Sequence, residues 1–198
     1  YVCAVYISSG SSSIAQRAAS RAARFPQVAL VDTFTDEAYA RSSIKLVGAP
    51  CSPLVSAALA VVEEALSLVD LSLTPHPAPH PRCGAVDMVA FMPLSDARAS
   101  ASDAALAACD SLAWQLAAQI GLLDVTVLTY GPRSGRSLLE ARRASSFFDS
   151  TRAEAPREVQ LLTPADAGPS TPSQRHGVCV VGAQPYVTNF NIQARRDS

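Results

Sequence analysis

The segment that most constrains the fold is residues 28–47, because it contains two strand-like runs with no helix between them. Residues 28–34 and 38–47 are rich in β-forming side chains, and only a few residues separate them. Neighbouring parallel strands need a crossover connection of about a dozen residues or more, and this link is too short to provide one. A doubly wound parallel sheet is therefore the weaker alternative for this chain.

Apolar runs and helical periodicity alternate along the rest of the sequence. We expect further strands at residues 1–7, 85–91 and 125–130. We expect helices at residues 14–25, at residues 53–70, from a cap at Ser100 or Ser102 to about residue 120, and at residues 138–148. Ser52 and Pro53 are the residue types of a helix cap and a first helical position. Residues 177–181 and 186–192 predict a closing hairpin that turns at Gly182 and Ala183.

This order of strands and helices predicts an α+β fold. It favours a ferredoxin-like sandwich, in which one mixed β-sheet carries its helices on one face. We expect one domain over residues 1–193 and a polar tail at residues 194–198. Hydrophobic residues make up 48% of the chain, which is enough for a substantial core.

The charge and the cysteines limit the classes of partner and compartment. A formal net charge of -1 gives no bulk attraction to nucleic acid or to an anionic membrane. No apolar run approaches the roughly 20 residues that span a bilayer. The cysteines form neither a CxxC pattern nor a disulfide framework, so we expect reduced thiols and a cytoplasmic location. They are Cys3, Cys51, Cys83, Cys109 and Cys179. The sequence begins at Tyr1 rather than Met, so we expect an excerpt of a longer chain.

Residues 76–94 join a proline-rich loop to an apolar strand and hold the first candidate for chemistry. His80 lies between two prolines, which restrict the backbone on both sides, and an imidazole suits proton transfer near neutral pH. Arg82 lies two residues further on and points to the same side of an extended segment, and Asp87 could orient either side chain. The alternative interpretation is a surface loop with polar tips.

Other chemistry is not supported in this loop. His76 and His80 are four residues apart, but the prolines between them exclude a helix and no third ligand is evident, so we expect no metal. No Gly-x-Ser-x-Gly elbow occurs in the chain. Cys83 is close to His80 in sequence, which does not establish the thiolate–imidazole geometry of a nucleophile.

Residues 168–177 (GPSTPSQRHG) are the second candidate. Two glycines bracket small hydroxyl and amide residues just before a strand. Such a segment lets the backbone approach a flat ligand and supplies hydrogen-bond donors to its edge. It lacks the glycine spacing of a nucleotide-phosphate loop, and the alternative is an ordinary connection.

Several motifs resemble one family. His80-Pro-Arg-Cys-Gly-Ala-Val-Asp87, followed by Phe91-Met-Pro93, resembles the HPRxGAxD…FxP segment of the N-terminal subdomain of glutamate formiminotransferase, the first part of formiminotransferase-cyclodeaminase. Further stretches resemble that family in the same order along almost the whole chain. They are residues 47–50, 124–131, 168–177, 182–183 and 189–192.

The resemblance implies an activity and a set of site residues. The family moves a formimino group from formiminoglutamate to N5 of tetrahydrofolate, with the histidine of its HPRxG motif as acid and base, which is His80 here. Arg82, Asp32 and Arg41 are possible substrate contacts. The implied folate contacts are Gly168, Pro169, Ser170, Thr171, Pro172, Ser173, Gln174, Arg175, His176 and Gly177. The family's site lies between two subdomains, and we expect the second to be absent from this chain.

Five departures from the family's pattern stand at polar positions: Tyr6, Phe34, Ala40, Pro79 and Gln184 replace Asn, Asp, Asn, Glu and Arg. Each lost transition-state contact costs about 2–4 kcal/mol. We therefore interpret the chain as a folate-binding formiminotransferase-like domain with a degraded catalytic site, that is, a pseudoenzyme or interaction module. An active transferase using His80 is the alternative, and an unrelated α+β binding domain is a third. We expect folate and formiminoglutamate as ligands, a homodimer or protein partner, and no nucleic acid or membrane span.

Overall fold

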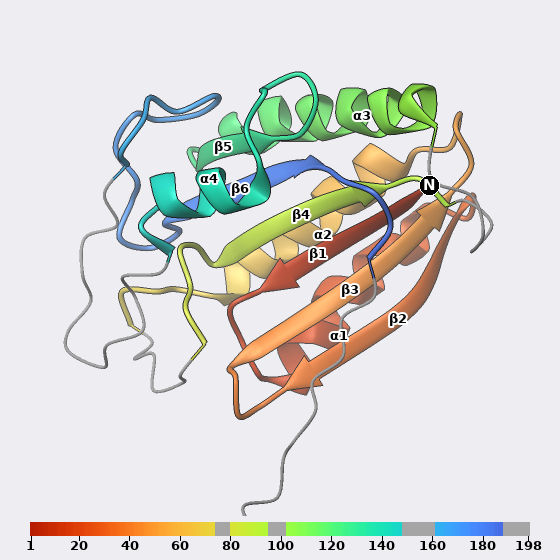
Figure 1. Cartoon of the computed structure of the whole chain (residues 1–198). Helices are drawn as coiled ribbons and strands as arrows, with labels where there is room; N and C mark the ends of the chain where they lie inside the picture. Colours follow the sequence, from red (N-terminus) through yellow and green to blue (C-terminus); the bar gives the residue numbers. More distant parts are fainter. Residues whose placement is uncertain (74–79, 95–101, 148–160, 188–198) are drawn as a thin grey trace, which may run out of the picture.

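The computed structural model describes residues 1–73, 80–94, 102–147 and 161–187 (Figure 1). The first part of the chain forms two strand–helix–strand units. Its elements are β1 (Val2–Ile7), α1 (Ser12–Ser20), the 3-10 helix η1 (Arg21–Arg24), β2 (Val28–Asp36), β3 (Arg41–Gly48), α2 (Leu54–Leu68) and β4 (Val86–Met92). The second part adds α3 (Asp103–Gly121), β5 (Thr126–Tyr130), α4 (Leu138–Ala144) and β6 (Val178–Ala183).

The strands form one mixed sheet in the order β2-β3-β1-β4-β6-β5. β2, β3, β1 and β4 pair antiparallel, which is the ferredoxin-like arrangement, and β6 and β5 continue the sheet in parallel with β4. The two runs expected in residues 28–47 are β2 and β3, which pair from Val28 opposite Gly48 to Asp36 opposite Arg41. The α+β prediction is confirmed.

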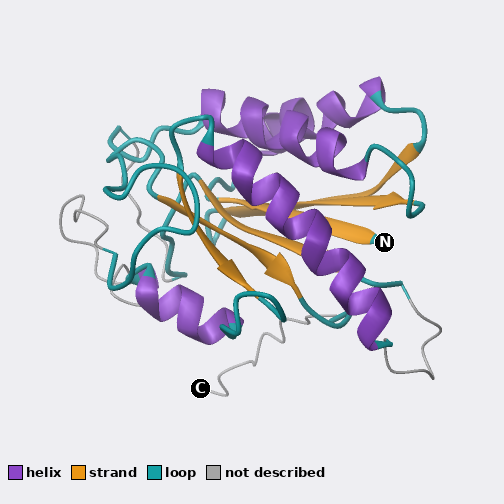
Figure 2. Cartoon of the chain, turned by 90° about the horizontal axis from the view of Figure 1, so that it is seen from above, coloured by secondary structure: helices purple, strands orange, loops and turns teal. Residues whose placement is uncertain are grey.

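Three helices, α1, α2 and α3, cover one face of the sheet, and the short α4 lies on the other face (Figures 1 and 2). Alternate residues of β1, Cys3, Val5 and Ile7, point into the main core beneath the three helices. Alanines at helical spacing on α1 let that helix approach the sheet closely. The opposite face carries a smaller cluster, in which Tyr130 and Phe147 are buried beneath α4.

One buried carboxylate joins the helices. Glu64 of α2 accepts hydrogen bonds from Arg17 Nη2 at 2.8 Å and from Arg21 Nε at 2.7 Å. The hydrogen bonds from Arg21 and Arg17 hold the pKa of this carboxyl below its ordinary value. The contact fixes α1 and η1 against α2. None of the described helices is long and apolar enough to cross a membrane.

The predicted hairpin turn at residues 182–183 is wrong. Gly182 and Ala183 do not form a hairpin turn, because they lie inside β6, which pairs in parallel with β4 on one side and β5 on the other. A Cβ at Gly182 would collide with Tyr130, so this glycine marks close packing rather than a turn. Most of the second hairpin strand, residues 188–192, lies outside the described residues, as does the expected polar tail.

The predicted cap of α2 is also wrong. The helix begins at Leu54 after Pro53, with no side-chain cap, and the Ser52 hydroxyl donates to the Ala49 carbonyl at 2.8 Å instead. The caps of α3 and α4 are regular. Ser102 caps α3 by accepting from the Ala105 amide, and Ser137 forms a capping box with Glu140 at α4.

The topology brings distant segments to one edge of the sheet. β1 and β2 end at this edge, and β3, β4, β5 and β6 begin there, because β1 is antiparallel to β3 and β4. Ser8 after β1, Arg41 at the start of β3, residues 80–85 before β4 and Gly177 before β6 therefore lie at the same edge. This edge holds the candidate site.

We expect Ala40→Gly to stabilise the protein. Ala40, in the turn between β2 and β3, has a φ of 49°, a left-handed conformation that costs a residue with a Cβ about 1–2 kcal/mol. Glycine removes that cost but is more flexible when unfolded, so the net gain in the free energy of unfolding is about 0.5–1 kcal/mol. Urea unfolding measures it. The control is Ala38→Gly in the same turn, which should not stabilise, and an equal gain in both variants would contradict the explanation.

We expect the contribution of Glu64 to be lost in acid. Because the folded state lowers the pKa of this carboxyl, its stabilisation is present above the ordinary glutamate value of 4.5 and disappears as the pH falls through the folded pKa. Glu64→Gln should lower the free energy of unfolding near neutral pH, and the difference from wild type should shrink as the pH falls below 4.5. The neighbouring exposed Glu63→Gln is the control. A difference independent of pH would contradict the assignment.

Candidate functional site

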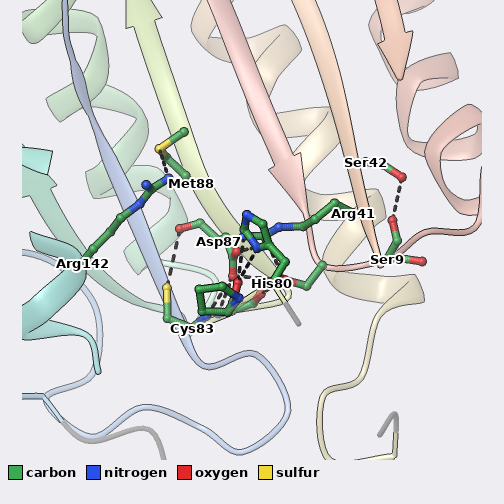
Figure 3. A network of polar contacts seen from close by, with 11 residues as sticks. Ser9, Arg41, Ser42, His80, Cys83, Asp87, Met88 and Arg142 are labelled. Atoms are coloured by element: carbon green, nitrogen blue, oxygen red, sulfur yellow. Dashed lines mark hydrogen bonds and ion pairs between the residues drawn. The ribbon is translucent and has the colours of Figure 1, made fainter. Parts of the chain in front are cut away.

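The Asp87 carboxylate is the centre of the polar network at this edge (Figure 3). Its side chain is 1% exposed, and its Oδ1 accepts the amide hydrogens of Cys83 at 3.0 Å and Gly84 at 2.9 Å. The Ser8 hydroxyl lies 3.0 Å from the same oxygen, and the guanidinium of Arg41 forms an ion pair with the carboxylate. A buried carboxylate is stable only with such partners. Asp87 thus folds residues 80–85 back onto the start of β4.

Arg41 spans from this carboxylate to the histidine loop. Its Nη1 donates to the Ser8 hydroxyl at 2.9 Å, and its Nη2 donates to the Pro81 carbonyl at 3.2 Å. Burial lowers the pKa of Arg41 to about 10, so it remains a cation at neutral pH. Arg41 was predicted as a substrate contact, but in the structure its guanidinium binds Ser8, Pro81 and Asp87 of the protein itself.

His80 is held by a hydrogen bond and by two aromatic rings. Its Nδ1 lies 2.8 Å from the Pro81 carbonyl oxygen. Tyr39 meets the imidazole edge-on with ring centroids 5.8 Å apart, and Phe147 meets it in the same way at 6.0 Å. The ring is half-buried, and its orientation is defined by β4's leading loop, the β2–β3 turn and the segment after α4.

The sheet face that carries α4 also holds a group of cations around Tyr6. Burial raises the pKa of the Tyr6 phenol, and the nearby charges of Lys45, Arg142 and Arg41 oppose that rise. Arg142 also stacks on the Phe147 ring, with its guanidinium carbon 4.8 Å from the ring centroid. Because Arg41 pairs with Asp87 and Lys45 pairs with Asp32, the positive charge of this face next to His80 comes mainly from Arg142.

Asp32 and Arg82 have different surroundings from His80. Asp32 lies on β2 and accepts a hydrogen bond from Lys45 Nζ at 2.9 Å, and this bond is the main reason why the pKa of Lys45 is raised. Arg82 is half-buried, and burial lowers its pKa. The network around Asp87 joins Arg41 to the His80 loop, whereas Asp32 belongs to a separate pair on the outer strand.

Both ends of segment 168–177 are fixed to the sheet. The Pro169 carbonyl accepts from the Thr126 hydroxyl at 2.8 Å at the start of β5. At the other end, the Ala85 amide donates to the His176 carbonyl at 2.9 Å, and Gly177 packs on the backbone of Cys83. The structure therefore brings the end of this segment beside the loop that carries His80.

The side chains of this segment point in different directions. The His176 ring is turned towards the body of the protein, and burial lowers its pKa. Arg175 pairs with Asp70 at 3.6 Å. Ser170, Thr171 and Gln174 are exposed.

Cys83 is a structural residue in this geometry. Its side chain is buried, burial raises the pKa of its thiol, and its sulfur lies 3.9 Å from the Asp87 carbonyl oxygen. A thiol with a raised pKa is a poor nucleophile at neutral pH. Within the part of the chain that the structure describes, no group of three or more His, Cys, Asp or Glu side chains could hold a metal, and His76 falls outside that part.

The residues that depart from the family pattern have different surroundings in the structure. Phe34 is 52% exposed on β2, and Ala40 occupies the left-handed turn position. Gln184 accepts a hydrogen bond from the Tyr130 hydroxyl at 3.1 Å, and Tyr6 lies near Lys45, Arg142 and Arg41 on the face that carries α4. Pro79 lies outside the described residues. The exposed Phe34 leaves this part of the face less polar than an aspartate would.

No local sequence pattern predicts the contacts of Phe147, Tyr39 and Ser8 at this site. Phe147 and Tyr39 contact His80 from segments far away in sequence. Ser8 stands in a serine-rich stretch in which each serine looks alike. Its position directly after β1 was the only available signal.

The comparisons with known proteins agree with the motifs. The family model for the formiminotransferase domain, N-terminal subdomain, matches residues 1–184. The formiminotransferase cyclodeaminase-like protein of Arabidopsis thaliana is 34% identical over 96% of this chain and 65% of its own length. Glutamate formimidoyltransferase of Thermoplasma acidophilum is 30% identical over 83% of this chain and 52% of its own length. Formimidoyltransferase-cyclodeaminase of Sus scrofa is 31% identical over 88% of this chain.

This chain spans only part of each relative, from 31% of the pig protein to 65% of the Arabidopsis protein. The family match nevertheless covers most of the chain, from β1 to the residue after β6. The chain belongs to the formiminotransferase N-terminal subdomain family.

Proposed function

We propose that this domain contributes the acid–base residue of a formimino-transfer site, with tetrahydrofolate as the acceptor. The observation that carries the proposal is the buried Asp87–Arg41 pair, which joins Ser8 and Pro81 to the His80 loop. Burying an ion pair is costly unless its geometry and hydrogen bonds compensate. Such an arrangement beside a half-buried histidine supports a role for that histidine in chemistry.

His80 acts as both base and acid in this proposal. Tetrahydrofolate, as co-substrate, supplies the N5 amine that attacks the amidine carbon of formiminoglutamate. The His80 imidazole accepts the N5 proton as the N5–carbon bond forms, and gives a proton to the departing glutamate nitrogen as the old carbon–nitrogen bond breaks. One group thus carries both transfers, which is worth about 10²–10⁴-fold in rate.

Two guanidinium groups near His80 support recognition of the substrates in this proposal. Tetrahydrofolate and formiminoglutamate both carry glutamate carboxylates, which pair favourably with guanidinium groups. Arg142 lies near Tyr6 on this face, and Arg82 lies two residues after His80. The exposed Ser170, Thr171 and Gln174 supply further polar contacts for the folate in this proposal.

A folate-binding or protein-interaction module without transfer activity is the second candidate. Three departures favour it. The family has a charged side chain at the positions of Phe34 and Gln184 and an asparagine at the position of Ala40, and this chain keeps none of these groups. In this case the network around Asp87 preserves the shape of the site rather than its rate.

The complete site needs a second surface against the face that carries His80. Because the chain spans 52% of the Thermoplasma relative and 65% of the Arabidopsis relative, we propose that a second subdomain, or a partner chain or second copy, provides it. The cytoplasmic location stays a proposal as well, supported by five cysteines that are all free.

We expect His80→Ala to abolish transfer while leaving folate binding intact. Formimino transfer from formiminoglutamate to tetrahydrofolate is measured for the full chain, alone and joined to the part of the Thermoplasma relative that this chain does not cover, and calorimetry measures folate binding. Loss of the general acid and base should lower the rate about 10²–10⁴-fold. Gln16→Ala, at an exposed position of α1 on the opposite side of the sheet, is the control and should leave both readouts unchanged.

The other outcomes separate the two candidates. Folate binding without transfer in every wild-type form would support the binding module. Transfer by His80→Ala at the wild-type rate would refute the role of His80. An absence of both binding and transfer in all forms would contradict both candidates.

A further inference from the structure

We propose that Arg41 is a positioning residue that fixes the tautomer of His80 through the carbonyl group of Pro81. The inference deepens the proposed function, since the tautomer decides which ring nitrogen can take a proton from the substrate. The juxtaposition that carries it is a chain of contacts from the buried Asp87 carboxylate through Arg41 and Pro81 to the imidazole ring.

The Pro81 carbonyl determines which ring nitrogen of His80 carries the proton. His80 Nδ1 lies 2.8 Å from the Pro81 carbonyl oxygen. A carbonyl oxygen accepts hydrogen bonds and cannot donate them, so Nδ1 must carry the proton. In the neutral imidazole, Nε2 then carries the lone pair, and Nε2 is the nitrogen that acts as the base.

The Pro81 carbonyl group is itself held in place by Arg41. The Pro81 oxygen also accepts from Arg41 Nη2 at 3.2 Å, so two donors converge on it. Arg41 is in turn fixed by the Ser8 hydroxyl at 2.9 Å and by its ion pair with Asp87, and its side chain is 12% exposed. The carbonyl that selects the tautomer is therefore held by a guanidinium that has little freedom to move.

The position of Arg41 requires an arginine rather than a lysine. A guanidinium presents several N–H groups in a rigid plane, so one nitrogen serves Ser8 and Asp87 while the other serves Pro81. A lysine ammonium is a single point of charge on a flexible stem. It could replace the charge opposite Asp87, but it could not hold the carbonyl in the same geometry.

The aromatic rings complete the constraint. Tyr39 and Phe147 meet the imidazole edge-on, at interplanar angles of 72° and 83°. They limit rotation of the ring, and the Pro81 carbonyl decides which nitrogen is protonated. Arg41 is assigned to this internal role. In the proposed function, Arg142 and Arg82 then recognise the substrate carboxylates.

Nitrogen-15 NMR of the histidine rings tests the proposal on the ligand-free full chain. The spectra are recorded at a pH where the rings are neutral, and His80→Gln assigns the His80 signals. We expect wild-type His80 to be in the Nδ1–H tautomer. Arg41→Lys, which keeps a charge opposite Asp87, and Arg41→Gln should both shift His80 towards the Nε2–H tautomer.

A matched control separates the hydrogen bond from the loss of charge. Lys45→Gln removes a cation from the same strand and the same face without touching Pro81, and it should leave the His80 tautomer unchanged. The proposal is overturned if wild-type His80 is in the Nε2–H form, if folded Arg41→Lys keeps the wild-type tautomer, or if Lys45→Gln shifts it as Arg41→Lys does.

The NMR result does not depend on transfer activity, so failure of the proposed function and failure of this inference are distinguishable. Where transfer is measurable, a second readout applies. Arg41→Lys should lower kcat and leave KM unchanged, because it disturbs the base and not substrate binding. A rise in KM at unchanged kcat would instead make Arg41 a substrate contact and overturn the proposal.

Discussion

The buried carboxylate of Asp87 is the interaction on which the rest of the candidate site depends. One oxygen accepts the amides of Cys83 and Gly84 and a hydroxyl from Ser8, and the carboxylate also pairs with Arg41. These partners lie at the ends of β1, β3 and β4, in segments that are far apart in sequence. A buried charge must be compensated by hydrogen bonds or an opposite charge. The bonds that compensate Asp87 also hold the loop that carries His80 in place.

The sheet topology makes this convergence possible. In a ferredoxin-like order, β1 ends where β3 and β4 begin, so Ser8, Arg41 and the loop before β4 meet without any long connection. The two parallel strands added after β4 bring the end of segment 168–177 to the same edge, beside Cys83 and Gly84. The fold thus places the end of the proposed folate segment beside the loop that carries the proposed base, while α1, α2 and α3 stabilise the other face.

Local patterns in the sequence predicted most of the fold, and contacts between distant segments account for what they missed. The strands at β2 and β3 followed from residue type and a short link, and the motif around His80 identified the loop. The turn expected at Gly182 failed because that glycine is required by the ring of Tyr130, which lies on another strand. The direction of Arg41 and the aromatic contacts of Tyr39 and Phe147 likewise depend on the folded sheet. The roles proposed for His80 and segment 168–177 stay predictions.

Amide hydrogen exchange at Cys83 and Gly84 tests the central role of Asp87 most directly. Both amides donate to a buried carboxylate, so in the wild-type protein they should exchange as slowly as the amides of β4, which open only in large-scale unfolding. In Asp87→Asn, which weakens the acceptor and removes the ion pair, they should exchange much faster while the amides of β1 remain protected. Rapid exchange of Cys83 and Gly84 in the wild type, at the rate of the exposed turn around Gly135, would contradict the account.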